Sequence, residues 1–105
     1  MADYYLVETV RGPAWGDTLS RRQQAGWTAH AGFMDRLVEE GVILLGAPVG
    51  ELDGDRALLV LNARDEDEVR TRLESDPWAD GVLSIASIRP WSIWLRSAAG
   101  VDGSA

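Results

Sequence analysis

The sequence contains no cysteine and no lysine, and each absence excludes a kind of chemistry. Without cysteine the chain has no disulfide, no thiolate nucleophile and no thiolate ligand for a metal. Without lysine it has no amine side chain that could form a Schiff base with a carbonyl substrate. All ten basic residues are therefore arginine, which genomic base composition explains more simply than selection for binding anions.

Histidine is scarce as well, since His30 is the single one in the chain. One histidine and no cysteine leave only carboxylate oxygens as a possible ligand set. No segment has the spacing of a calcium-binding loop. We therefore expect no metal and no other cofactor.

The sequence also lacks a long hydrophobic run and an excess of positive charge. Charged residues, glycine or proline interrupt its apolar runs before the roughly 20 residues that span a bilayer. Its first residues lack the basic and apolar regions of a signal peptide. The net charge of -7 argues against nucleic acid binding. We expect a cytoplasmic protein that binds neither membranes nor nucleic acid.

What remains is the composition of an ordinary globular domain. The chain has 105 residues, of which 46% are apolar and 26% are charged, enough for one domain with its own core. We assign residues 1–96 to this domain and expect residues 97–105, which are small and polar, to form a flexible tail.

The pattern of apolar residues predicts four strands and two helices. Alternating or continuous apolar residues predict strands, the second of them buried, at residues 3–10, 42–45, 56–63 and 82–95. Helical spacing predicts a first helix from Trp27 that Gly41 ends, and a second helix that Asp65 caps and that runs to about Ser75. This order of elements is that of an α+β fold of the ferredoxin-like, split βαβ type.

Two segments within this order carry additional signals. Residues 11–24 are rich in turn signals and predict a loop with one helical turn near Leu19, of a length that is often functional. Pro90 in the last strand indicates a sheet edge or a bulge, because proline cannot donate a ladder hydrogen bond.

The first helix places the single histidine on its apolar face. That face consists of Trp27, His30, Ala31, Met34, Leu37 and Val38. Histidine changes its charge near neutral pH, so His30 is the default candidate for a general acid or base. The alternative is a core histidine that hydrogen-bonds a backbone carbonyl, and the position of His30 does not separate the two.

Asp76 is the candidate partner of His30. It ends the second helix, and in a split βαβ fold the two helices lie side by side on the sheet, so its carboxylate could orient the imidazole. The alternative is a turn aspartate before Pro77, which has a purely local cause. Asp35 lies about 140° around the first helix from His30, so we expect it to be solvated.

The strands predict a second copy of the chain. Two helices can cover only one face of a four-stranded sheet, yet the last three strands carry apolar residues on both faces. An uncovered face of this kind would be an unusually large apolar patch. We therefore expect a homodimer that packs sheet to sheet.

Several short motifs resemble the YciI-like (YCII-related) family over about residues 3–96. They are Trp27-x-x-His30-x-x-Phe33-Met34-Asp35-x-Leu37, Gly41, Leu44-Leu45-Gly46-Ala47-Pro48, Asp76-Pro77-Trp78 and Ile88-Arg89-Pro90-Trp91. The resemblance implies a ferredoxin-like fold that dimerises as an α/β barrel. It also implies an active-site His and Asp pair, which by position is His30 and Asp76.

The resemblance further implies small-molecule chemistry, because one characterised relative removes chloride from a chlorinated hydroxyhydroquinone and the fold is shared with muconolactone isomerase. Two positions depart from the pattern of some relatives. Trp27 stands where they carry arginine, and Ala47 stands where they carry glycine. The first departure puts recognition of an anionic substrate by that arginine in doubt.

We therefore expect a small dimeric enzyme, a lyase or isomerase without metal, in which His30 moves a proton and Asp76 fixes its tautomer. Its unknown substrate would lie between the helices and the sheet, against Trp27, Trp78 and Tyr5. Trp91 and Trp94 could add to an aromatic pocket for a flat ligand, although packing explains most tryptophans. The alternatives are a non-catalytic ligand-binding or regulatory module, and a structural dimer whose His30 only satisfies a buried acceptor.

Overall fold

The structure is a computed structural model that describes residues 4–97, and it contains the predicted order of elements. The four strands are β1 (Tyr4–Arg11), β2 (Ile43–Pro48), β3 (Ala57–Leu61) and β4 (Leu83–Trp91). The two helices are α1 (Trp27–Glu39) and α2 (Glu66–Leu73). Short 3₁₀ turns at Arg21–Gln23 and Pro77–Ala79 precede α1 and follow α2. Of the predicted tail, residues 98–105 lie outside the described residues.

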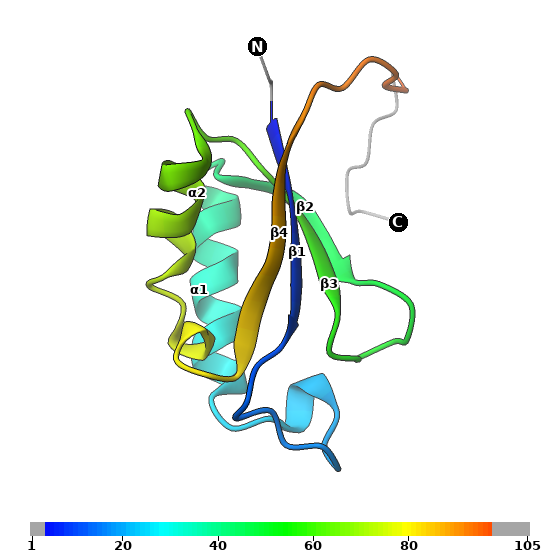
Figure 1. Ribbon diagram of the computed structural model, residues 1–105, viewed down its shortest axis with the longest axis vertical. Coiled ribbons are helices and arrows are strands. Elements are labelled where there is room, and N and C mark those ends of the chain that lie inside the picture. Colours follow the sequence, from blue (N-terminus) through cyan, green and yellow to red (C-terminus); the bar gives the residue numbers. More distant parts are fainter. Residues whose placement is uncertain (1–3, 98–105) are drawn as a thin grey trace.

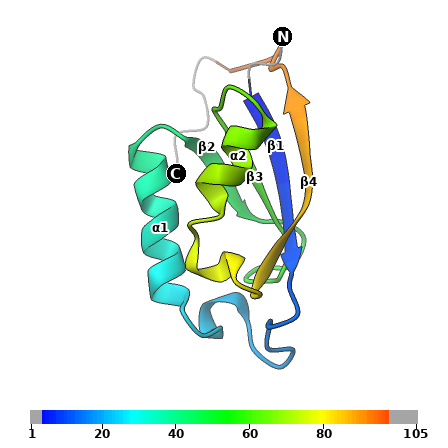
Figure 2. The ribbon, with the colours of Figure 1, turned by 60° about the vertical axis from the view of Figure 1, so that its left-hand side comes forward.

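The strands form one antiparallel sheet in the order β2-β3-β1-β4. This order is compatible with the ferredoxin-like arrangement that the sequence predicts. Both helices lie on the same face of the sheet (Figure 1). Figure 2 shows α1 and α2 side by side in front of the sheet, with the segment after α2 beside the first half of α1.

The prediction for the second strand is wrong in its end and in its burial. β2 continues to Pro48 instead of ending at Leu45, because Pro48 pairs with Ala57 of β3. The residues of β2 after Ile43 are exposed, since β2 is an edge of the sheet in the single chain. The apolar run of this strand therefore does not lie in the interior of the chain.

The last strand lies at the other edge of the sheet, as Pro90 within it indicates. It ends at Trp91 and not at Leu95, and Trp91 pairs with Tyr4 of β1. A register shift in the pairing with β1 falls between Glu8 and Thr9.

An aliphatic core fills the space between the helices and the sheet. Its buried residues are Val7, Phe33, Leu37, Val42, Ile43, Leu59, Leu61, Val69 and Leu73, and we refer to them as the aliphatic core. The predicted apolar face of α1 is wrong at two positions, because it omits Phe33, which is buried, and includes Val38, which is exposed. The buried residues of α1 are spaced three and four apart, at His30, Phe33 and Leu37. Val38 follows Leu37 directly, so its side chain points about 100° away around the helix axis.

Of the two hydrogen bonds that define a capping box, one is present at the start of α2. The N–H of Glu68 donates to the Asp65 carboxylate over 2.8 Å, while the Glu68 carboxylate accepts from the N–H of Arg64 instead of that of Asp65. α2 ends at Leu73, two residues before the predicted end. The segment that follows α2 runs beside α1 (Figure 2).

Candidate active site

α1 begins at a position that suits glycine. Gly26 has a φ of 81°, in the left-handed region, and its carbonyl accepts a helical hydrogen bond from the N–H of His30 over 3.0 Å. A Cβ at Gly26 would lie 3.3 Å from Nε1 of Trp78. The start of the helix is therefore fitted closely to the indole of Trp78, and His30 lies one turn further on.

His30 and Asp76 are in direct contact. Nδ1 of His30 lies 2.9 Å from both carboxylate oxygens of Asp76, and both side chains are buried, with His30 only 4% exposed. Asp76 also caps the Pro77–Ala79 turn, where its Oδ1 accepts the N–H of Trp78 over 2.9 Å. The local role of a turn aspartate and the contact with the histidine thus occur together in one residue.

The contact with Asp76 determines the arrangement of the imidazole protons. An ionised carboxylate only accepts hydrogen bonds, so the proton on Nδ1 faces Asp76. In the neutral ring the lone pair then lies on Nε2, for which no hydrogen-bond partner occurs within residues 4–97. The partner of His30 is a side-chain carboxylate and not the backbone carbonyl that the alternative of a core histidine requires.

Tryptophan side chains surround the imidazole. The Trp78 indole stacks on the His30 ring with centroids 4.0 Å apart and planes within 9°, and its N–H donates to the carbonyl of Ala25 over 2.8 Å. Trp27 lies 5.8 Å from His30 and 5.7 Å from Trp78 between ring centroids. Trp78 is fully buried and fixes the plane of the imidazole, whereas Trp27 is half-buried and borders open space.

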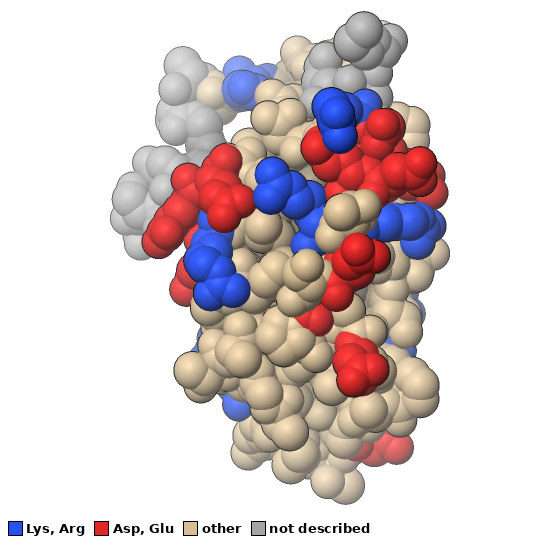
Figure 3. All heavy atoms as spheres, turned by 90° about the vertical axis from the view of Figure 1, so that its left-hand side faces the viewer, with Lys and Arg blue, Asp and Glu red and all other residues tan. Residues whose placement is uncertain are grey.

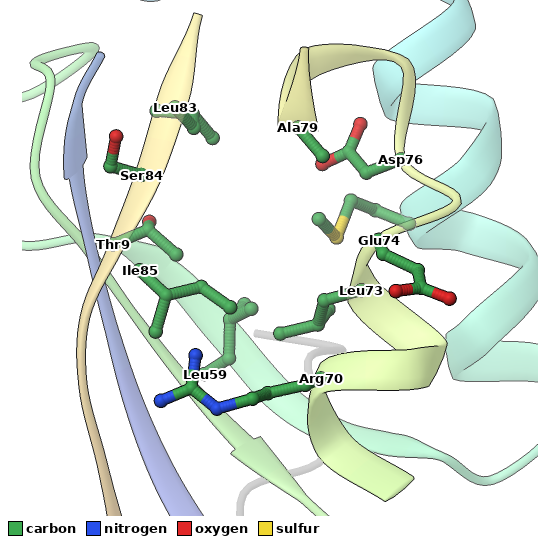
Figure 4. Close-up of a pocket in the computed structure, with 11 residues that line it drawn as sticks. Thr9, Leu59, Arg70, Leu73, Glu74, Asp76, Ala79, Leu83, Ser84 and Ile85 are labelled. Carbon is green, nitrogen blue, oxygen red and sulfur yellow. The ribbon is translucent and has the colours of Figure 1, made fainter. Parts of the chain in front are cut away.

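Two adjoining cavities flank the His30 and Asp76 pair. A cavity of about 210 Å³ is lined by His30, Trp27 and Arg21, among other residues. A second, of about 420 Å³, is lined by Asp76 and lies between the segment around α2 and the sheet (Figure 4). Residues shared by the two linings are Thr9, Met34, Leu59 and Leu83. The cleft that the sequence places between helices and sheet is therefore present.

The other predicted ligand-binding residues lie elsewhere. Tyr5 packs against the aliphatic core and lines neither cavity. Trp91 and Trp94 are exposed and also line neither cavity. Asp35 is exposed, as expected, but it borders the smaller cavity.

Arg21 is a buried residue of this region that the sequence does not single out. Its Nε donates to the carbonyl of Gly54 over 2.9 Å, and its guanidinium carbon lies 5.7 Å from the Trp78 ring centroid and 5.8 Å from that of Trp15. Burial lowers the pKa of the Arg21 guanidinium, although neighbouring aspartates oppose this effect. No sequence signal separates Arg21 from Arg22, because burial of Arg21 depends on residues that follow some thirty positions later.

The segment that presents Arg21 is held by a glutamine. The Gln24 side chain accepts from the N–H of Gly16 over 2.8 Å and donates to the carbonyls of Gly16 and Leu19. Trp15 in the same segment is buried against Trp78. The predicted loop at residues 11–24 is thus an ordered wall beside the site.

No metal site or membrane span is found in the part of the chain that the structure describes. Within residues 4–97, no three His, Cys, Asp or Glu side chains lie close enough together to hold a metal ion. None of the helices in this range combines the length and the apolar character that crossing a bilayer requires.

Comparisons with known proteins agree with the fold. A model of the YCII-related domain matches residues 6–92, which confirms the resemblance found in the sequence. Among solved structures, the chain is similar to 5-chloro-2-hydroxyhydroquinone dehydrochlorinase (TftG) from Burkholderia phenoliruptrix AC1100, in complex with 2,5-dihydroxybenzoquinone. The two are 22% identical, with a TM-score of 0.59, over 93% of this chain and 99% of that chain. A comparison with curated proteins finds no match.

Proposed function

The chain belongs to the YCII-related domain family, and we propose that it is a small-molecule enzyme in which His30 transfers a proton and Asp76 holds His30 in position. The observation that carries this proposal is the 2.9 Å contact of His30 Nδ1 with both oxygens of Asp76 beside a cavity. Such a pair leaves Nε2 to exchange the proton with a ligand.

The proposed chemistry is that of a lyase or isomerase. Nε2 of His30 removes a proton from a carbon of the substrate, and the electron pair of that C–H bond forms a double bond. In an elimination the bond to a leaving group on the neighbouring carbon breaks, and the group departs with the electron pair of that bond. In an isomerisation the electron pair of an adjacent double bond moves along the carbon skeleton and takes the proton back from the imidazolium at another carbon. The Asp76 carboxylate stabilises the imidazolium between these steps. The proposal requires no metal or other cofactor, since one imidazole both accepts and returns the proton.

The proposed substrate is a small flat molecule. Trp27 offers a half-buried ring at the edge of the smaller cavity, beside His30. The similar dehydrochlorinase is described in complex with a planar quinone, which supports a ligand of this shape here. Dehydrochlorination, the loss of a proton and a chloride ion, is one elimination that fits the proposed steps.

We also propose that the enzyme is a homodimer built as an α/β barrel. The sheet face opposite the helices carries Leu6, Val60 and Leu45, which follow one another across β1, β3 and β2. Leu45 and Trp91 of β4 are exposed, whereas Val60 is already buried in the single chain. A second copy on this face would remove the exposed side chains from water. A monomer in analytical ultracentrifugation at the concentration of the activity assay would contradict this assembly.

The test of the proposed function is the His30→Asn variant. The asparagine amide can still donate to Asp76 but cannot take up a proton. Chloride release from 5-chloro-2-hydroxyhydroquinone is the first assay, followed by related halogenated and unsaturated cyclic carbonyl compounds. We expect the variant to lose at least about 100-fold in turnover, in line with general acid–base catalysis.

The matched control is Glu39→Gln, an exposed position on the same helix, which should keep the full rate. A folded His30→Asn variant with an unchanged rate on any substrate that is turned over would contradict the proposal. Binding of 2,5-dihydroxybenzoquinone without turnover of any assayed compound would favour the non-catalytic module instead.

A further inference from the structure

Arg21 carries a buried donor without a partner. Its side chain is 5% exposed, and its terminal nitrogen Nη2 is buried with no hydrogen-bond partner within residues 4–97. No other buried side-chain nitrogen or oxygen of these residues lacks a partner. Native proteins pair nearly all such groups, and an unpaired donor on a cation is more costly than one on a neutral group. Nη2 of Arg21 is therefore a donor for which a hydrogen-bond partner is to be sought.

The guanidinium cannot easily turn toward bulk water, because hydrogen bonds hold both its Nε atom and the backbone of Arg21. Nε donates to the carbonyl of Gly54, and the backbone N–H of Arg21 donates to the carbonyl of Asp53 over 2.8 Å. The indoles of Trp15, in the loop before Arg21, and of Trp78, in the Pro77–Ala79 turn, also lie against the guanidinium. The planar fork of arginine is thus anchored through Nε, and Nη2 is the donor that the described chain leaves unpaired.

The carboxylates near Arg21 are engaged with other groups. Asp53 accepts from the backbone N–H of Arg22 and lies 3.7 Å from its guanidinium. Asp55 pairs with Arg11, and Asp76 accepts from His30 and from the N–H of Trp78. No side-chain carboxylate within residues 4–97 forms an ion pair with Arg21, so its charge has no direct counterion in the described chain.

Arg21 and His30 line the same cavity. Both contact the Trp78 indole, with His30 stacked at 4.0 Å and the Arg21 guanidinium carbon at 5.7 Å from the ring centroid. The two groups are therefore no farther apart than the sum of these distances. The cavity they share measures about 210 Å³. A cavity of roughly 150 Å³ already holds one benzene ring, so a single six-membered ring with small substituents fits here.

From these observations we infer that Arg21 binds an ionised oxygen of the ligand, and that the site takes a small planar molecule that bears a carboxylate, enolate or phenolate. This inference builds on the proposed function and names its class of substrate. When His30 removes a proton from a carbon next to a carbonyl, the C–H electron pair forms a C=C bond and the carbonyl π pair moves onto oxygen. Nη2 of Arg21 would donate to that oxygen, and a preorganised donor of this kind stabilises the charge as it develops.

The test compares benzoate with benzamide, two planar probes of nearly equal size of which only benzoate is charged. Isothermal titration calorimetry measures the binding of each probe to the full chain, to Arg21→Met and to Arg22→Met. Arg22 is the matched control, because it is adjacent and its side chain is 70% exposed. We expect the unmodified chain and Arg22→Met to prefer benzoate by about ten-fold or more, as a charge-assisted hydrogen bond implies. Arg21→Met should lose this preference.

The inference would be overturned if Arg21→Met preferred benzoate over benzamide as strongly as the unmodified chain does. The absence of any preference for benzoate in the unmodified chain, or the absence of saturable benzoate binding, would also overturn it, and neither of these outcomes depends on whether Arg21→Met folds. The His30→Asn variant separates this inference from the proposed function. If it keeps both its turnover and its preference for benzoate, the proton-transfer role fails while the anion-binding role of Arg21 remains.

Discussion

Most of the buried hydrophobic side chains of the described chain form two regions that differ in their polar neighbours. The aliphatic core consists of valine, leucine, isoleucine and phenylalanine side chains. The second region is an aromatic cluster formed by Trp15, Trp27, Trp78, Val82 and Leu83. The buried polar residues of the described chain are Thr9, Arg21, Gln24, His30 and Asp76, and none of them belongs to the aliphatic core. Because a polar group is costly to bury, the concentration of these residues beside the aromatic cluster agrees with the site proposed there.

The outer surface of the helices shows a related division. Charged side chains gather toward the end where α2 lies, whereas the end beside the Pro77–Ala79 turn is largely uncharged (Figure 3). The surface charges of α2 include the i,i+4 pair of Glu66 and Arg70. The charged residues of the helix surface thus lie mostly away from the end that holds the proposed site (Figure 3).

The largest expected effect on stability concerns the aliphatic core. Leu61 is 0% exposed, and Leu61→Ala should lower the free energy of unfolding by about 2–5 kcal/mol through lost burial and a cavity. Urea denaturation followed by circular dichroism measures this loss. Leu52→Ala, at a position that is 92% exposed, is the control and should stay within about 0.5 kcal/mol of the unmodified chain. Equal losses in the two variants would contradict the role of the aliphatic core as the main source of stability.

A smaller loss of stability is expected from Asp76→Asn. The amide oxygen can still accept one hydrogen bond, but the charged acceptor shared by His30 and the N–H of Trp78 is gone. We expect the free energy of unfolding to fall by about 1–3 kcal/mol, less than for Leu61→Ala. Asp80→Asn, which replaces an exposed aspartate just beyond the same turn, should have no effect. A loss larger than that of Leu61→Ala would mean that the polar site is itself the main source of stability.

The smallest effect is expected at the exposed ion pair between Arg11 and Asp55. The hydrogen bond from Arg11 lowers the pKa of the Asp55 carboxyl below its usual range. The pair therefore contributes stability above the ordinary carboxyl pKa of about 4, and this contribution disappears as the pH falls through the lower folded-state pKa.

In Asp55→Asn, the free energy of unfolding should fall less steeply as the pH is lowered below about 4 than it does in the unmodified chain. The change should be smaller than in either buried variant, because water and salt screen exposed charges. Glu51→Gln, in the same loop, is the control. Equal dependence of the free energy of unfolding on pH in Asp55→Asn and the unmodified chain would show that the pair does not affect stability.

The sequence predicts the pairing of His30 with Asp76 but not the whole site. Helical spacing puts His30 on the inner face of α1, and the order of elements brings the end of α2 beside it, so the pattern makes both residues candidates. The resemblance to the YCII-related family is what names them as an active-site pair. Their chemical roles remain predictions. Arg21 could not be found in this way, because its burial comes from the loop at residues 53–54 and from two indoles.

The errors in the fold have the same origin in contacts distant in sequence. The end of β2 is set by pairing of Pro48 with Ala57 across the hairpin, which no apolar pattern reveals. The alternation of side chains along β1 correctly predicts that Tyr5 faces the helices. Tyr5 nevertheless lies at the end of the sheet that the aliphatic core occupies. Periodicity identifies the face of an element, whereas the position along that face depends on tertiary packing.

The most direct test of the account is nitrogen NMR of the imidazole ring, which is unambiguous because the chain has a single histidine. The account predicts that neutral His30 carries its proton on Nδ1, facing Asp76, with Nε2 unprotonated. It also predicts that Asp76→Asn increases the share of the other tautomer. A neutral His30 with its proton on Nε2 in the unmodified chain would contradict the proposed role of the pair.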